Sequence, residues 1–108
     1  MKEKGIYRHF KGNLYCVLGS GTGSEGERYV IYRQLYGDHG YWIRPVEMFF
    51  SCKEQDGKQI RRFSRIEDSE ETLPEGAALE ALRLTHSETL EPYRITVDAQ
   101  GEYRLTKA

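Results

Sequence analysis

The chain has 108 residues, of which 31% are charged and 38% hydrophobic, and its formal net charge is −1. This length suits one folded domain, and the apolar and aromatic content excludes a disordered chain. No apolar run approaches the roughly 18 residues of a membrane-spanning helix, and the first residues contain no signal-peptide core. We therefore expect a cytoplasmic protein with no membrane partner.

Three β-hairpins are predicted in the first 63 residues. Each joins runs of alternating polar and apolar residues through a short turn: residues 6–10 before Lys11-Gly12-Asn13, residues 29–43 around Gly37-Asp38-His39-Gly40, and residues 51–63 around Asp56-Gly57. Glycine and serine dominate Ser20–Glu27, which predicts a loop without packing contacts. The run "VEMFF" after Pro45 lacks a period of two and predicts a single helical turn.

The remaining residues change character. Residues 67–75 are acidic and read as an exposed connector, and Thr72 with Glu75 resembles a capping box at the start of a short helix that ends near Leu84. Residues 93–105 alternate around a turn and predict a fourth hairpin.

These elements predict a mainly β fold with one short helix. Residues 5–66 are expected to form a small SH3-like barrel, and the helix and hairpin of residues 76–108 to pack on the same core, so that residues 1–108 make one domain. Trp42 and Phe49 are predicted core residues because the chain has few other large apolar side chains. Cys16 and Cys52 stand singly in strand-like runs and are predicted to be buried, reduced thiols.

Separated motifs along the chain resemble those of a family of short bacterial domains of unknown function. The resemblance spans Gly5–Phe63 through "GIYRHFKGNLY", "VIYRQLYGDHGYWIRPVEMFF" and "RRF". It carries no assigned activity. The positions that match the family pattern are Tyr7, Arg8, His9, Lys11, Gly12, Tyr15, Tyr32, Tyr36, Trp42, Arg44, Pro45, Met48, Phe49 and Phe63.

One motif departs from the family pattern. In the pattern that this chain resembles, His-Ser-Glu-Thr-Leu-Glu-Pro stands just before the "VIY" strand. This chain has "GSEGER" there, with Gly23 at the place of the histidine. An intact "THSETLEPY" instead occupies Thr85–Tyr93. This arrangement indicates an insertion, a duplication or an engineered topology in which the segment has been relocated.

The sequence favours a non-enzymatic binding or interaction module. Rings and cations on one face of the first hairpin predict a groove for a small ligand or peptide, and the expected ligand-binding residues are Tyr7, His9, Tyr36, Trp42, Arg44, His86 and Glu88. Residues 1–63 hold 11 Lys/Arg against 7 Asp/Glu, a net +4, whereas residues 64–108 hold 5 against 10, a net −5. This excess predicts weak, salt-sensitive binding to single-stranded nucleic acid.

Two alternatives remain open. His86 and Glu88 stand two residues apart, which would place both side chains on one face of a strand as the centre of a small hydrolase or transferase, with Cys16 or Ser87 as nucleophile. The second alternative is that the chain is an engineered scaffold without a selected activity. Histidines 9, 39 and 86 have no metal-ligand spacing, so we expect neither a metal site nor a cofactor.

Overall fold

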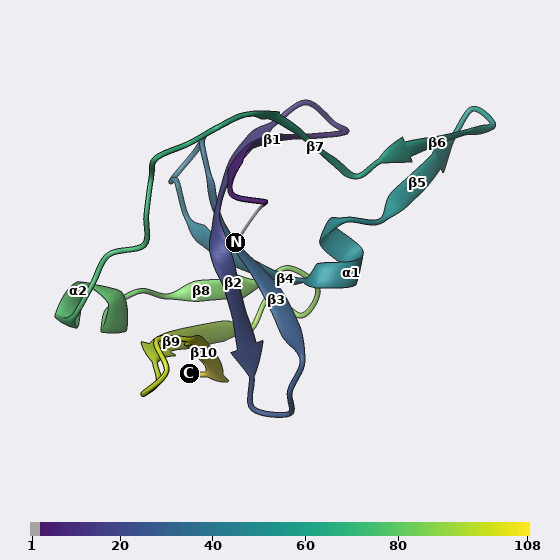
Figure 1. The fold of residues 1–108 in the computed structure, drawn as a ribbon. Coiled ribbons are helices and arrows are strands. Elements are labelled where there is room, and N and C mark those ends of the chain that lie inside the picture. Colours follow the sequence, from purple (N-terminus) through teal and green to yellow (C-terminus); the bar gives the residue numbers. More distant parts are fainter. Residues whose placement is uncertain (1–2) are drawn as a thin grey trace.

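The structure is a computed structural model and describes residues 3–108 (Figure 1). Strands predominate, and the two helices have four residues each. In chain order the elements are β1 (Gly5–His9), β2 (Leu14–Gly23), β3 (Arg28–Gln34), β4 (Tyr41–Pro45), α1 (Val46–Phe49), β5 (Cys52–Gln55), β6 (Lys58–Arg61), β7 (Phe63–Glu67), α2 (Ala77–Glu80), β8 (Leu84–His86), β9 (Pro92–Val97) and β10 (Tyr103–Lys107).

Six strands form a closed barrel. β2, β3 and β4 make one antiparallel meander, and β8, β9 and β10 make a second. β4 pairs in parallel with β8, and β10 pairs in parallel with the second half of β2, which closes the ring. The first half of β2 pairs with β1, which in turn pairs with β7. The predicted small β barrel is confirmed, but half of its strands come from residues 84–107 rather than from 5–66 alone.

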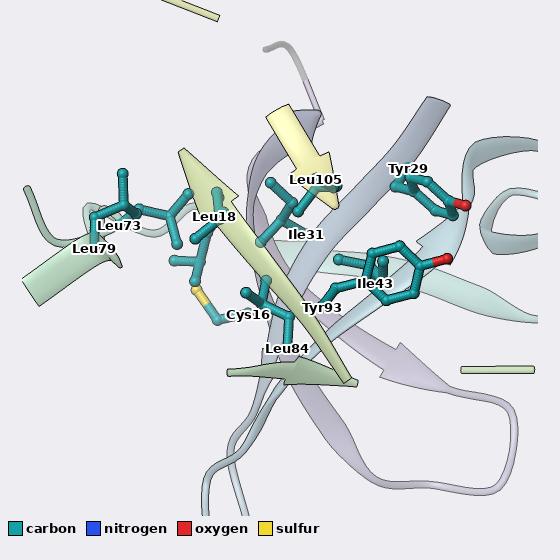
Figure 2. Packing of buried hydrophobic residues seen from close by; sticks show 11 residues of the cluster. Cys16, Leu18, Tyr29, Ile31, Ile43, Leu73, Leu79, Leu84, Tyr93 and Leu105 are labelled. Atoms are coloured by element: carbon teal, nitrogen blue, oxygen red, sulfur yellow. The ribbon is translucent and has the colours of Figure 1, made fainter. Parts of the chain in front are cut away.

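The first meander contributes buried side chains on both of its faces. Inward-facing side chains from both meanders fill the barrel together with one leucine from the connector after β7 and one from α2. Figure 2 shows this cluster, which comprises Cys16, Leu18, Tyr29, Ile31, Ile43, Leu73, Leu79, Leu84, Tyr93, Ile95 and Leu105. A second cluster lies on the outer face of β2 and β3, where β1, β7 and α1 cover it, and comprises Tyr7, Val17, Val30, Tyr32, Phe49 and Phe63. Alternation along β3 therefore assigns neighbouring residues to different cores.

The second core is built largely from aromatic rings. Phe49 and Phe63 stack with ring centroids 4.1 Å apart, and Tyr7 and Tyr32 each approach Phe49 at 5.3 Å. Phe49 is fully buried, as predicted. Trp42 is half-buried at the edge of this cluster instead of at its centre, because its strand position faces outward where the cover from α1 ends.

The Ser20–Glu27 loop prediction is wrong for its first half. Ser20–Gly23 belong to β2, where residues 20–22 pair with β3 and residues 21–23 pair with β10, which leaves only a tight turn before β3. Gly21 has a packing role here, because a Cβ atom at this position would lie 3.0 Å from Leu105 Cδ1. The glycine at this position therefore allows β2 and β10 to approach closely, and it does not mark a segment without packing contacts.

The helix prediction also needs correction. α2 covers only Ala77–Glu80, and its N-cap is Gly76, which has a φ of 61° and provides no side-chain cap, so the predicted Thr72–Glu75 capping box does not start this helix. Leu84 lies in β8, not at the helix end, and is fully buried in the barrel. Thr85 and His86 pair in parallel with β4, and Thr85 also pairs with β9.

β5 and β6 form the predicted hairpin around Asp56-Gly57, both with positive φ. Figure 1 shows this hairpin extending away from the barrel. Its strand residues are exposed apart from Ile60, and Cys52 is therefore exposed, contrary to the predicted burial.

Residues after β7 are tied back to the barrel by an ion pair. Arg33 on β3 donates to both carboxylate oxygens of Glu71, with Nε–Oε2 and Nη2–Oε1 distances of 2.7 and 2.8 Å. This geometry lowers the pKa of Glu71 mainly through the hydrogen bonds from Arg33. Nearby Leu73 is 4% exposed and completes the barrel core.

We predict that Leu105→Ala lowers the free energy of unfolding by about 2–5 kcal/mol, because it removes a fully buried side chain from the contact that closes the barrel. Urea unfolding measures this loss. Val97→Ala on the preceding strand, where the side chain is 49% exposed, should change stability by less than about 1 kcal/mol. Equal, small effects of both substitutions would show that the carboxy-terminal meander is not part of the folding unit.

We also predict that Glu71→Gln destabilises the protein by about 1 kcal/mol at neutral pH, a modest figure because the pair still touches solvent. The lowered pKa of Glu71 means that its contribution is complete above the unfolded-state value of about 4.3 and disappears as the pH falls through the folded-state value. Urea unfolding of both proteins from pH 7 to pH 3 should therefore converge at low pH. Glu70→Gln, at an exposed neighbouring position, should match the parent throughout.

Candidate functional site

A groove of about 250 Å³ opens on the outer face of β3 and β4, beside the loop that joins β8 to β9. Most of its wall is aromatic, and the other lining side chains are one arginine, one serine and one leucine. The residues that line it are Tyr15, Tyr32, Tyr36, Trp42, Arg44, Ser87 and Leu90. The structure thus brings together Tyr36, Trp42 and Arg44 of the predicted ligand-binding residues.

Hydrogen bonds fix the side chains of the groove. The hydroxyls of Tyr15 and Tyr36 lie 2.6 Å apart, and the indole Nε1 of Trp42 donates to Gln34 Oε1 at 2.9 Å. Tyr32 approaches Tyr15 with ring centroids 5.5 Å apart. The groove is therefore largely preformed, which limits the entropy lost when a ligand binds.

Arg44 is held in place without a strong ion pair. Its Nε donates to the Tyr32 hydroxyl at 3.3 Å, and its guanidinium lies over the Phe63 ring at 5.3 Å from the centroid. The nearest carboxylate is that of Glu88, at 3.9 Å from Nη1 and 42% exposed. Such a long, partly solvated pair is weak, so the guanidinium can bind a competing anion.

Tyr7 and His9 do not line the groove. Tyr7 is 4% exposed, and its hydroxyl donates to the Glu3 carbonyl at 2.7 Å, so it is a core residue. His9 is half-buried behind the groove wall, with its ring 4.9 Å from Phe63 and 6.4 Å from Tyr15. The predicted face of Tyr7 and His9 is thus covered by β7 and α1.

His86 lies inside the mouth of the barrel and supports the groove from behind. It is 8% exposed, and its ring centroid lies 5.5 Å from that of Tyr29 and 5.7 Å from that of Tyr93. Its Nδ1 accepts from the backbone N–H groups of Glu88 and Thr89, at 3.1 and 3.3 Å. This acceptor role assigns the ring proton to Nε2 and fixes the loop that carries Ser87 and Leu90.

The predicted His86–Glu88 side-chain pair does not form. The strand ends at His86, and the Glu88 carboxylate turns outward, where it accepts from Ser87 Oγ at 3.1 Å and faces Arg44. Glu88 contacts His86 through its backbone N–H only.

Cys16 has the surroundings of a structural thiol. It is fully buried in the barrel, and its Sγ lies 3.4 Å from Ser69 Oγ. Burial raises the pKa of the thiol, which disfavours the nucleophilic thiolate. The contacts of Cys16 and Glu88 thus offer no support for the hydrolase or transferase alternative.

Across residues 3–108, no group of three or more His, Cys, Asp or Glu side chains is placed to hold a metal ion. Within the same residues, no helix has the length and apolar character needed to cross a bilayer.

Residues 5–65 match the family described as Protein of unknown function (DUF1653). The chain belongs to this family. The matched residues contain the first meander and the elements that cover its outer face, but not β8, β9 or β10. No curated protein and no solved structure matches the chain.

Four lining residues, Tyr15, Tyr32, Ser87 and Leu90, were absent from the expected ligand-binding residues. Alternation could have found Tyr32, because it pairs directly with Trp42 and shares its outward face. No local signal identifies Ser87 or Leu90, since the parallel pairing of β8 with β4 brings them to the groove.

We predict that iodoacetamide labels one thiol in the native protein and two in the urea-unfolded chain, because Cys52 is exposed and Cys16 is buried. Intact-mass measurement counts the adducts. Cys52→Ser should leave the native protein unlabelled. Rapid double labelling under native conditions would instead reveal an accessible Cys16 and return it to consideration as a nucleophile.

Proposed function

We propose that the protein is a non-enzymatic binding module whose groove takes a planar ring that carries an anionic group, either a carboxylate or a phosphate. The observation that carries the proposal is the convergence of Tyr36 and Trp42 with the weakly paired Arg44. Aromatic walls favour a ring through stacking and apolar burial, and a guanidinium favours a planar or tetrahedral oxyanion.

The tyrosine hydroxyls leave a hydrogen-bond donor free in the groove. Only one proton lies between the hydroxyls of Tyr15 and Tyr36, so the accepting hydroxyl keeps its own proton for a ligand. Burial, followed by the hydrogen bond with Tyr36, raises the pKa of Tyr15 far above its ordinary value. The Tyr15 hydroxyl therefore stays protonated at neutral pH, which suits an anionic ligand.

The surroundings of the groove are also cationic. Burial lowers the pKa of His9, and the positive charges of Arg44, Arg62, Lys11 and Lys53 lower it further. Lys11 and Lys53 additionally lie over the Phe10 ring, at 5.9 and 4.7 Å from its centroid. This concentration of positive charge favours the approach of an anion.

The test uses the fluorescence of Trp42, the one tryptophan of the chain, which forms part of the groove wall. Benzoate and phenyl phosphate should change its emission saturably, whereas neutral benzamide should not. The two anions separate a carboxylate from a phosphate preference. A short single-stranded oligonucleotide, which supplies rings and phosphates together, should bind weakly and dissociate as salt is added.

We predict that Arg44→Gln weakens binding of the preferred anion by roughly 10- to 100-fold, the usual effect of losing a hydrogen bond to a charged group. Glu88→Gln should strengthen binding, because it removes the carboxylate that competes for Arg44. Arg83→Gln, which changes the net charge equally at an exposed position away from the groove, should leave the affinity unchanged.

Two results would contradict the proposal. Equal responses to benzoate and benzamide would mean that Arg44 does not select the ligand. No saturable response to any probe at millimolar concentration would favour the alternative of a scaffold without a selected activity.

A further inference from the structure

The two meanders of the barrel pair with one another in the same register. In the parallel pairing of β10 with β2, Tyr103 faces Gly21 and Leu105 faces Gly23. In the parallel pairing of β4 with β8, Tyr41 faces Leu84 and Ile43 faces His86. Superimposing one pairing on the other makes β2 equivalent to β8 and β4 equivalent to β10.

The antiparallel pairings repeat this equivalence. Tyr29 faces Pro45 and Ile31 faces Ile43 in the first meander. Tyr93 faces Lys107 and Ile95 faces Leu105 in the second. The aligned sequences "TGSEGERYVI" (22–31) and "THSETLEPYRI" (85–95) share Thr, Ser-Glu, Glu, Tyr and Ile, with one additional residue in the second loop.

The two loops close with equivalent backbone hydrogen bonds. In the first, Gly23 N–H donates to the Glu27 carbonyl at 2.8 Å, and Gly26 N–H donates to the Gly23 carbonyl at 3.1 Å. In the second, His86 N–H donates to the Glu91 carbonyl at 3.0 Å, and Leu90 N–H donates to the His86 carbonyl at 2.9 Å. Gly26 and Leu90 both have positive φ, 85° and 63°.

A carboxylate in one loop replaces the imidazole of the other. A side chain at position 23 would overlap the Glu27 carboxylate, so Glu27 occupies the space that corresponds to the His86 ring. Glu27 Oε1 accepts from the Glu25 N–H at 2.8 Å, as His86 Nδ1 accepts from the N–H of the equivalent Glu88 at 3.1 Å.

Tyr29 and Tyr93, which are equivalent in the two meanders, contact each other between the loops. The rings of Tyr29 and Tyr93 lie 6.1 Å apart, and their hydroxyls point to the same end of the barrel (Figure 2). Burial, followed by the hydrogen bond with Tyr93, raises the pKa of Tyr29. Contact between equivalent residues is expected where a local twofold axis passes between two copies.

We propose that residues 84–107 are a second copy of the meander formed by residues 14–45, and that the inner face of the first meander is an interaction surface whose partner is another meander of the same kind. The barrel is then a pseudo-twofold pair of half-barrels joined in one chain by residues 46–83. This inference rests on register, loop geometry and sequence, and is independent of the ligand proposed for the groove.

A loop graft tests the equivalence in the full-length chain. Replacing "GSEGER" (23–28) by "HSETLEP" should keep a single cooperative urea transition with a midpoint close to that of the parent, because the grafted imidazole takes the place of the Glu27 carboxylate. Long-range proton–nitrogen NMR spectra of the histidines should show the grafted ring in the same Nε2–H tautomer as His86.

The matched control is the same replacement with "SHETLEP", which moves the histidine one position and turns it outward. It should lower the unfolding midpoint and give a solvent-exposed imidazole, because the N–H equivalent to that of Glu25 loses its acceptor. The reciprocal graft, "GSEGER" in place of residues 86–92, should also fold cooperatively. Identical behaviour of the "HSETLEP" and "SHETLEP" proteins, or failure of both the direct and reciprocal grafts to fold, would overturn the proposal.

Discussion

The close approach of β10 to β2 at Gly21 is the contact on which the architecture depends. Without a side chain at this position, β10 can lie in parallel register against the second half of β2 and place Leu105 over the gap. This pairing turns a row of strands into a closed barrel, removes two sheet edges and separates an inside from an outside. Every assignment of a side chain to the core or to the groove follows from that separation.

Closure also explains why the groove combines residues from distant parts of the chain. The outer face of β3 and β4 supplies Tyr32, Trp42 and Arg44, while the pairing of β8 with β4 delivers the loop with Ser87 and Leu90. His86 connects these two parts from the inside, since its imidazole packs among core rings and its Nδ1 orders that loop. The His86 side chain therefore stabilises both the barrel core and the loop that borders the groove.

Local sequence patterns predicted the hairpins, because a hairpin depends on contacts between residues that are close in the sequence. The alternation around Lys11-Gly12-Asn13 and the Asp56-Gly57 turn identified hairpins whose strands pair with sequence neighbours. The parallel pairings join strands separated by dozens of residues, and no local pattern encodes them. The same limit applied to the site: Trp42 and Arg44 were found from residue type, whereas the burial of Tyr7 depended on the later placement of β7 and α1.

The second meander serves as an internal comparison for the aromatic groove. Its strands have the same pairing as β3 and β4, yet Thr96, Arg104 and Thr106 occupy the positions equivalent to Tyr32, Trp42 and Arg44. The barrel backbone therefore does not require aromatic side chains at these outward positions. Packing under α1 and β7 accounts for the buried Tyr32 but not for the half-exposed Trp42, whose indole is held by Gln34 at the rim. This half-exposed ring beside the weakly paired Arg44 is therefore the feature on which the proposal of a ligand-binding groove rests.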